Sequence, residues 1–78
     1  MKEVSNMHVT LNTIEKVTDF VTVMSKLEDD VNLVSGRFVV DAKSILGILS
    51  LDLSKPIKVE FIGSKDQKEI ISIISAFE

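Results

Sequence analysis

Three side chains of this sequence could take part in chemistry: His8, Thr13 and Ser44. The neutral imidazole of His8 can act as a nucleophile or a base. Thr13 and Ser44 each precede an apolar segment, where a hydroxyl caps a helix by accepting from a free backbone N–H. The same free N–H groups make a helix start a weak anion site. Plain capping is the alternative interpretation for both hydroxyls, and an inert surface histidine is the alternative for His8.

The remaining polar residues show no arrangement typical of an active site. There is no cysteine and one histidine, which excludes disulfides, thiolate or His-rich metal sites and His–His proton relays. Glu28, Asp29 and Asp30 are adjacent rather than on one face, so they predict a solvated acidic turn. Asp66 and Glu69 suit the start of a helix. We expect no metal, no cofactor and no enzymatic activity.

Length and charge restrict the class of protein. The 78 residues are 45% hydrophobic, which predicts one folded domain over residues 1–78. The net charge of −3 gives no basic footprint for nucleic acid. Apolar runs are shorter than the roughly 20 residues that span a bilayer, and the polar N-terminus does not resemble a secretory signal. We expect a soluble cytoplasmic protein with no membrane contact.

Residues 7–11 alternate between apolar and polar types, which predicts a half-buried strand with His8 on its open face. From Ile14 the period becomes helical. Thr13 is the predicted N-cap, and Glu15 is favourable in the first turn. The predicted apolar stripe of this helix consists of Ile14, Val17, Phe20, Val21, Met24 and Leu27.

Two extended runs follow, Val31–Val34 and Arg37–Val40, joined by Ser35-Gly36. They predict a β-hairpin in which Gly36 takes the positive φ that the turn requires. A second helix is predicted from Ser44 to about Leu53. Lys55-Pro56 ends it, because proline disfavours helical geometry in the preceding residue.

The last part of the chain predicts a strand over Ile57–Ile62, a turn at Gly63-Ser64-Lys65 and a C-terminal helix. The turn lacks the flanking glycines of a phosphate loop, so no nucleotide site is expected. The order is β-α-β-β-α-β-α, which predicts an α+β fold with a four-stranded antiparallel sheet covered on one face by three helices. The apolar residues of the C-terminal helix are Ile70, Ile71, Ile73, Ile74 and Phe77.

The segment from Asp41 to Leu53, DAKSILGILSLDL, has more large hydrophobic residues than one small helix can bury. Ile48 and Leu51 lie one turn apart and should face the sheet. The other three, Ile45, Leu46 and Leu49, are then exposed as an apolar patch, which in a monomer usually marks an interface. The alternative is that they belong to a crowded core.

The stretch DVNLVSGRFVVDAKSILGILSLDL, residues 30–53, resembles the second half of HPr, the histidine-containing phosphocarrier protein of the bacterial sugar phosphotransferase system. The element order matches the HPr-like open-faced sandwich, and residues 55–78 fit the family's last strand and helix. The resemblance is weak before Thr22. It implies an HPr-like protein that acts as a regulatory or docking module in sugar transport.

The weak part is where the family has its carrier motif, a histidine, a small residue, an arginine and a proline. An ungapped count places Thr13 at the phosphohistidine position, Glu15 at the arginine position and Lys16 at the proline position. A threonine phosphate ester transfers poorly, and Glu15 would repel a phosphate. The chain therefore resembles a divergent Crh-like member without carrier activity. An active carrier with His8 or Thr13 as an atypical acceptor is the first alternative.

Ser44 matches the serine that HPr kinase/phosphorylase modifies in the Gram-positive members and in the Crh paralogues. The resemblance implies regulatory phosphorylation there, and a phosphate at a helix start meets N–H donors. It also implies that Ile45, Leu46 and Leu49 bind protein partners, which in the family are the kinase, enzyme I, enzymes II and a transcriptional regulator. A purely structural or self-associating domain is the second alternative.

Overall fold

The computed structural model describes residues 7–28, 30–62 and 67–78, with the side chains of residues 67–69 left out. Its elements follow the expected order, with a short 3₁₀ helix added at the end. They are β1 (His8–Val9), α1 (Ile14–Met24), β2 (Asp30–Ser35), β3 (Phe38–Asp41), α2 (Ile45–Leu49), β4 (Ile57–Ile62), α3 (Gln67–Ile74) and η1 (Ser75–Phe77). Asp29, Asp66 and the predicted turn at Gly63-Ser64-Lys65 lie outside the described residues.

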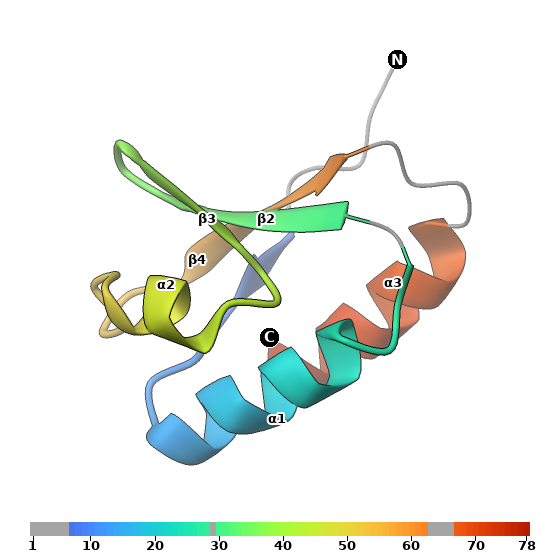
Figure 1. The fold of residues 1–78 in the computed structure, drawn as a ribbon, viewed down its shortest axis with the longest axis horizontal. Coiled ribbons are helices and arrows are strands. Elements are labelled where there is room, and N and C mark those ends of the chain that lie inside the picture. Colours follow the sequence, from blue (N-terminus) through green and yellow to red (C-terminus); the bar gives the residue numbers. More distant parts are fainter. Residues whose placement is uncertain (1–6, 29, 63–66) are drawn as a thin grey trace.

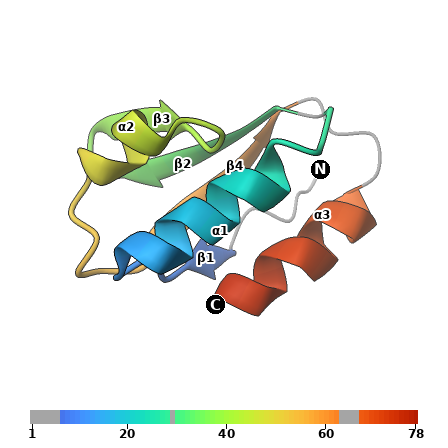
Figure 2. The same ribbon diagram turned by 60° about the horizontal axis from the view of Figure 1, so that its bottom comes forward.

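The four strands form one antiparallel sheet in the order β1-β4-β2-β3. In the ribbon, α1 and α3 run side by side along the same face of this sheet (Figures 1 and 2). The rings of Phe20 and Phe77 meet edge to face with centroids 5.2 Å apart, which joins α1 to η1. The predicted α+β open-faced sandwich is confirmed.

The buried side chains come from one face of the sheet and the inner sides of the helices. Strand residues alternate, so Val31 and Leu33 of β2 are buried whereas Asn32 is only partly covered. His8 lies in β1 opposite Lys58 and is exposed, as its place in the alternation predicted. The fully buried large side chains include Leu11, Phe20, Met24, Leu33, Ile48, Ile57, Ile70 and Ile74.

Three local predictions are wrong. Asp30 is the first residue of β2 rather than part of an acidic turn. Ile14 was assigned to the apolar stripe of α1, but its side chain is 62% exposed. The first buried side chain of this helix is Val17. The second helix ends at Leu49 instead of Leu53: the N–H groups of Ser50 and Leu51 donate to the carbonyls three residues back, which closes the helix. Asp52 then accepts from the N–H and the hydroxyl of Ser54 in a separate turn.

The β2–β3 hairpin has the geometry expected from Ser35-Gly36. Ser35 pairs with Phe38, so Gly36 and Arg37 make a two-residue connection. Gly36 has φ +61, whereas Arg37 has a negative φ. Glycine at the first central position is what a type II′ turn requires, and this turn suits the twist of a hairpin.

Candidate functional site

Ser44 is the N-cap of α2, and its hydroxyl is held by the first turn of that helix. Its side-chain oxygen accepts from the N–H of Gly47 at 3.1 Å, and its carbonyl accepts from the N–H of Ile48 at 3.0 Å. The backbone of Ser44 is extended (φ −108, ψ 108), as is usual for an N-cap. Ser44 is half-buried, and the hydrogen bond of its side-chain oxygen is partly buried.

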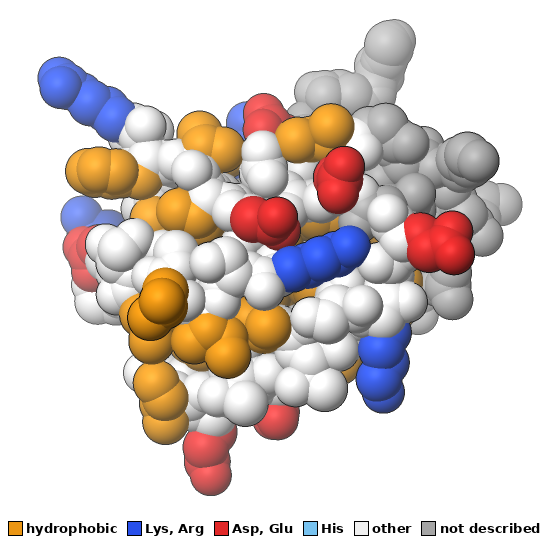
Figure 3. Space-filling view, in the orientation of Figure 1, with side chains coloured by type: hydrophobic (Ala, Val, Ile, Leu, Met, Phe, Trp, Pro, Cys, Tyr) orange, Lys and Arg blue, Asp and Glu red, His pale blue; other side chains and the backbone are white. Residues whose placement is uncertain are grey.

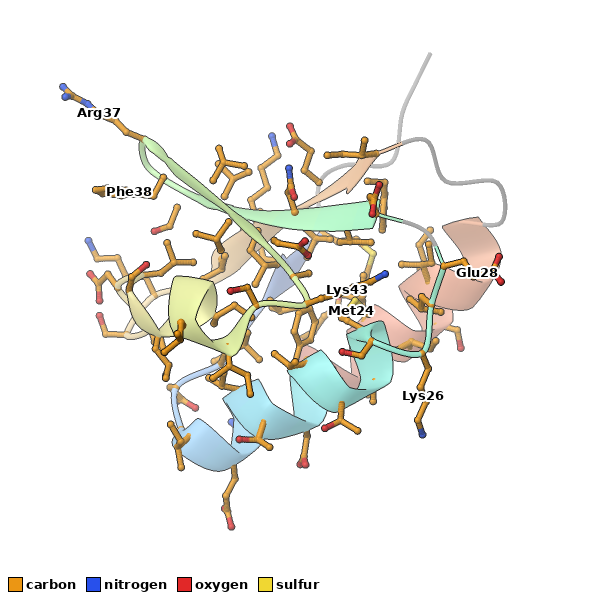
Figure 4. All side chains as sticks on the ribbon, viewed as in Figure 1. Met24, Lys26, Glu28, Arg37, Phe38 and Lys43 are labelled. Atoms are coloured by element: carbon orange, nitrogen blue, oxygen red, sulfur yellow. The ribbon has the colours of Figure 1, made fainter. Side chains whose placement is uncertain are left out.

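The loop before Ser44 is fixed by Asp41 and Lys43. A side-chain oxygen of Asp41 accepts from the N–H of Lys43 at 2.8 Å, and the Asp41 carbonyl accepts from the N–H of Ser44 at 3.0 Å. The Nζ of Lys43 donates to the carbonyl oxygen of Leu27 at 2.7 Å. Figure 4 shows Lys43 reaching across to Met24 at the C-terminal end of α1. Ser44 therefore follows a turn that the Lys43 hydrogen bond connects to the segment after α1.

Gly47 allows α2 to lie close against β3. A Cβ at this position would come 3.1 Å from both the Ser44 side-chain oxygen and the Cβ of Val40. The Ser44 oxygen can rotate, but the Val40 Cβ belongs to β3 and is fixed by the sheet. The lack of a side chain at Gly47 thus lets the Ser44 cap and β3 approach the same turn.

The apolar face of α2 divides as the spacing predicted. Ile48 is fully buried and Leu51 is 7% exposed, whereas Leu46 is 83% exposed. Ile45 and Leu49 are each 40% exposed, so the alternative of a crowded core is wrong. Figure 3 shows hydrophobic side chains gathered over α2 and the beginning of α1. Ile45, Leu46 and Leu49 are called the α2 patch below.

The start of α1 has the same kind of cap in different surroundings. Thr13 accepts through its side-chain oxygen from the N–H of Lys16 at 3.2 Å, which confirms the predicted N-cap. Glu15 lies in this first turn and is exposed. Lys16 is the nearest cation in sequence, and its Nζ donates to the side-chain oxygen of Asn12 at 3.1 Å. This helix start therefore combines one carboxylate with one ammonium group that is already hydrogen-bonded.

A shallow pocket of about 240 Å³ lies between the beginning of α1 and the end of η1. Its lining mixes one ammonium group with carboxylates and therefore has no single charge preference. Thr13, Ser44 and His8 are outside it. The lining residues are Thr10, Lys16, Asp19, Ala76, Phe77 and Glu78.

In the described part of the chain, no group of three or more His, Asp or Glu residues is arranged to hold a metal ion. Over the same residues, the structure contains no helix long and apolar enough to cross a membrane. His8 is exposed on the sheet, opposite Lys58. The structure thus places the three reactive side chains on three separate elements: His8 in β1, Thr13 before α1 and Ser44 before α2.

The family model described as the PTS HPr component phosphorylation site matches residues 14–78. The chain belongs to the HPr family of the phosphotransferase system. The match begins one residue after Thr13, so it covers Ser44, the α2 patch and every element from α1 onward.

Solved structures agree with this family. HPr-C-His from Thermoanaerobacter tengcongensis is 28% identical with a TM-score of 0.71, over 97% of this chain and 93% of that one. Crh, the catabolite repression containing protein of Bacillus subtilis, has a TM-score of 0.68 and 24% identity, over 97% of this chain and 88% of that one. That structure describes Crh as a dimer with a swapping domain. Comparison with the curated proteins gives no match.

Two features of the site were not predicted from the HPr-like sequence pattern. The contact from Lys43 to the Leu27 carbonyl joins residues that are 16 positions apart, and no short motif signals it. Phe38 is 66% exposed and Ile14 is 62% exposed, although periodicity alone assigns both to elements with a buried side. They lie near the ends of β3 and α1, where the sheet and helices stop covering each other.

Proposed function

We propose that this HPr-family protein is a regulatory or docking protein without phosphocarrier activity, switched by phosphorylation of Ser44. The observation that carries the proposal is the position of Ser44: a half-buried N-cap hydroxyl directly beside the exposed α2 patch. Family membership supports an interaction with proteins of the phosphotransferase system. The proposed partners are an HPr kinase/phosphorylase and proteins that bind the α2 patch, among them enzyme I, enzyme II or a transcriptional regulator.

The local geometry supports a phosphate on Ser44. The first turn of α2 is uncharged, so its free N–H groups can donate to the phosphate without a neighbouring carboxylate in the turn. Two negative charges would then stand at the edge of an apolar surface. A partner that buries Leu46 would have to desolvate them, whereas a partner with arginine residues would gain charge-assisted hydrogen bonds. The modification would exchange one class of partner for another.

The proposed lack of carrier activity is supported by the start of α1. By the ungapped count Thr13 takes the phosphohistidine position, and its side-chain oxygen accepts from the Lys16 N–H. Glu15 stands at the arginine position and brings a negative charge where phosphate needs a positive one. A phosphate ester of threonine is also a poor donor for onward transfer. The active carrier with His8 or Thr13 as acceptor remains the alternative, followed by a purely structural or self-associating domain.

The first experiment separates these functions by phosphorylation. The purified chain is incubated with HPr kinase and ATP, and in parallel with enzyme I and labelled phosphoenolpyruvate. We expect kinase-dependent label on the wild type and on Thr13→Ala, which is the matched hydroxyl control, and no label on Ser44→Ala. Equal labelling of Ser44→Ala would remove the proposed site. Acid-labile label on His8 from enzyme I would show a working carrier instead.

The second experiment tests the α2 patch. Leu46→Glu should abolish capture of the partner and leave the free energy of unfolding nearly unchanged, because the side chain is 83% exposed. Ile62→Glu makes the same charge change at another exposed hydrophobic residue, on β4. It should bind partners like the wild type. Loss of binding in both variants would mean that net charge, and not the α2 patch, decides docking.

A further inference from the structure

Among the described residues, β3 is one of the two edge strands of the sheet, and the backbone N–H and C=O groups of alternate residues point away from β2. The strand order places β3 beside β2 alone. The N–H of Ala42 donates to the Val31 carbonyl at 2.9 Å, so even-numbered residues from 38 to 42 make the hydrogen bonds to β2. Val39 and Asp41 therefore direct their N–H groups away from the sheet. Such an edge is a template for another strand.

The residues on this edge are unusually apolar for an unpaired strand. Phe38 is 66% exposed and Val39 is 55% exposed. They lie on opposite faces of the sheet, because Phe38 and Val39 are successive residues of one strand, paired with Ser35 and Val34. β3 contains no lysine or proline, the residues that natural sheets use to block edge pairing. Covering β3 with one more strand would shield both hydrophobic side chains at once.

We propose that β3 pairs with β3 of a second copy of this chain, antiparallel, with Val39 opposite Val39 on the two-fold axis. This register places Arg37 of each copy opposite Asp41 of the other, and Phe38 opposite Val40. Val39 and Asp41 both direct their backbone groups away from β2, and Arg37 lies in the turn just before β3, so the register is compatible with a short ladder that has Arg37 at its end. Figure 4 shows Arg37 projecting from the tip of the hairpin, clear of the rest of the chain.

Charge complementarity selects this register over its neighbours. The neighbouring registers that still place odd-numbered residues opposite odd-numbered residues are centred on Phe38 or on Val40. Centring on Phe38 puts Arg37 opposite Val39, and centring on Val40 puts Asp41 opposite Val39. Each leaves a charge facing an apolar residue, whereas the proposed register makes two opposite-charge pairs, which stabilise neighbouring strands.

The pairing would also give hydrogen-bond partners to the outward backbone groups of β3. The two Val39 residues exchange a pair of N–H···O bonds, and each Asp41 N–H can donate to the Arg37 carbonyl of the other copy. The Asp41 carbonyl already accepts from the Ser44 N–H at 3.0 Å. A two-fold contact of this kind closes on itself and stops at a dimer. With four residues per strand, the contact is smaller than a stable interface of roughly 1,200 Å² or more, so the dimer should form only at high concentration.

The experiment is sedimentation velocity on the full chain from micromolar to millimolar concentration, with ¹⁵N-labelled spectra over the same range. We expect a weak dimer and concentration-dependent shifts at the Val39 and Asp41 amides. Arg37→Glu should weaken it about tenfold, because two attractive pairs become repulsive. Val39→Lys, at an exposed position that tolerates the change, should also weaken it. Lys26→Glu is the control with the same change in net charge, on the exposed loop after α1, and should dimerise normally.

Mixing provides a test specific to the register. Arg37→Glu and Asp41→Lys each place like charges opposite one another in a homodimer, but an equal mixture of the two restores both opposite-charge pairs. A heterodimer that exceeds either homodimer supports the proposal. A monomer at millimolar concentration overturns it, as does a dimer indifferent to both Arg37→Glu and Val39→Lys. A dimer lost in Leu46→Glu and retained in Arg37→Glu would place the contact on the α2 patch and would also overturn it.

Discussion

Thr13 and Ser44 stand in the same relation to their helices. Each accepts through its hydroxyl from the N–H three residues later, at 3.2 Å and 3.1 Å. Their surroundings differ: Thr13 is exposed and followed by Glu15, whereas Ser44 is half-buried and followed by an uncharged apolar turn. The two hydroxyls therefore have the same capping geometry, and they differ in their own exposure and in the charge of the turn that follows. Our proposal of a phosphate on Ser44 rests on this difference.

The two helices also differ in how they are supported. α1 has 11 residues and buries four of them, whereas α2 has five residues and buries one, Ile48. A five-residue helix cannot persist on its own propensity, so its stability comes from contacts with the rest of the fold. Ile48 and the loop hydrogen bonds before Ser44 provide those contacts. The predictions below test this support, from the largest effect to the smallest.

The largest effect is expected for the buried side of α2. Ile48→Ala should lower the free energy of unfolding by about 3 kcal/mol, because it leaves a cavity in a fully buried site. Leu46→Ala, two residues earlier and 83% exposed, should change it by no more than about 0.5 kcal/mol. Urea denaturation followed by circular dichroism measures both. Similar losses in the two variants would mean that Leu46 packs into the core and that the α2 patch does not exist.

The next effect concerns the hydrogen bond between the Ser44 loop and the segment that follows α1. Lys43→Met keeps the aliphatic stem but removes the hydrogen bond to the Leu27 carbonyl. Because the ammonium group is charged and the contact is partly buried, we expect a loss of about 1.5 kcal/mol in unfolding free energy. Lys26→Met removes an exposed lysine near the same end of α1 and should be nearly neutral. If the two variants unfold alike, water replaces this hydrogen bond at no cost.

Local patterns were enough to predict much of this structure. Two extended runs joined by Ser35-Gly36 predicted the hairpin, alternation predicted the outward side of β1, and helical spacing predicted which residues of the α2 segment face inward. These predictions hold because each depends on neighbours within one element. The capping roles of Thr13 and Ser44 were predictable for the same reason, since the donor is three residues away.

The failures depend on contacts between distant segments. Ile14 fits the helical stripe, but whether it is covered depends on where the sheet ends. The length of α2 was overestimated because the N–H groups of Ser50 and Leu51 bond to carbonyls three residues back, and a separate turn at Asp52 and Ser54 follows. The fit of Gly47 against Val40 and the reach of Lys43 to Leu27 exist only in the folded chain. The Ser44 site was thus predictable as a helix cap, but its support was not.

A smaller effect compares the two caps directly. Thr13→Ala and Ser44→Ala should each lower the free energy of unfolding by about 1 kcal/mol, because each leaves a backbone N–H of the first turn without its acceptor. Thr22→Ala, in the exposed middle of α1, is the control, since its hydroxyl only bonds back to the Thr18 carbonyl. It should be neutral or slightly stabilising. A much larger loss for Ser44→Ala would show that this hydroxyl also holds β3 against α2.

The smallest effect lies in the turn that ends the α2 segment. The hydroxyl and then the N–H of Ser54 donate to Asp52, and these bonds hold the pKa of that carboxyl below its usual value, with a further small contribution from Lys55. A lowered pKa in the folded state means that the stabilisation is present above the carboxyl's ordinary pKa and is lost as pH falls through the lowered value. Ser54→Ala should raise the pKa of Asp52, as measured by NMR titration of its side-chain carbon. Ser50→Ala, whose hydroxyl donates to the Gly47 carbonyl, should leave the pKa unchanged. An unchanged pKa in Ser54→Ala would show that the Ser54 hydroxyl is not what lowers the pKa of Asp52.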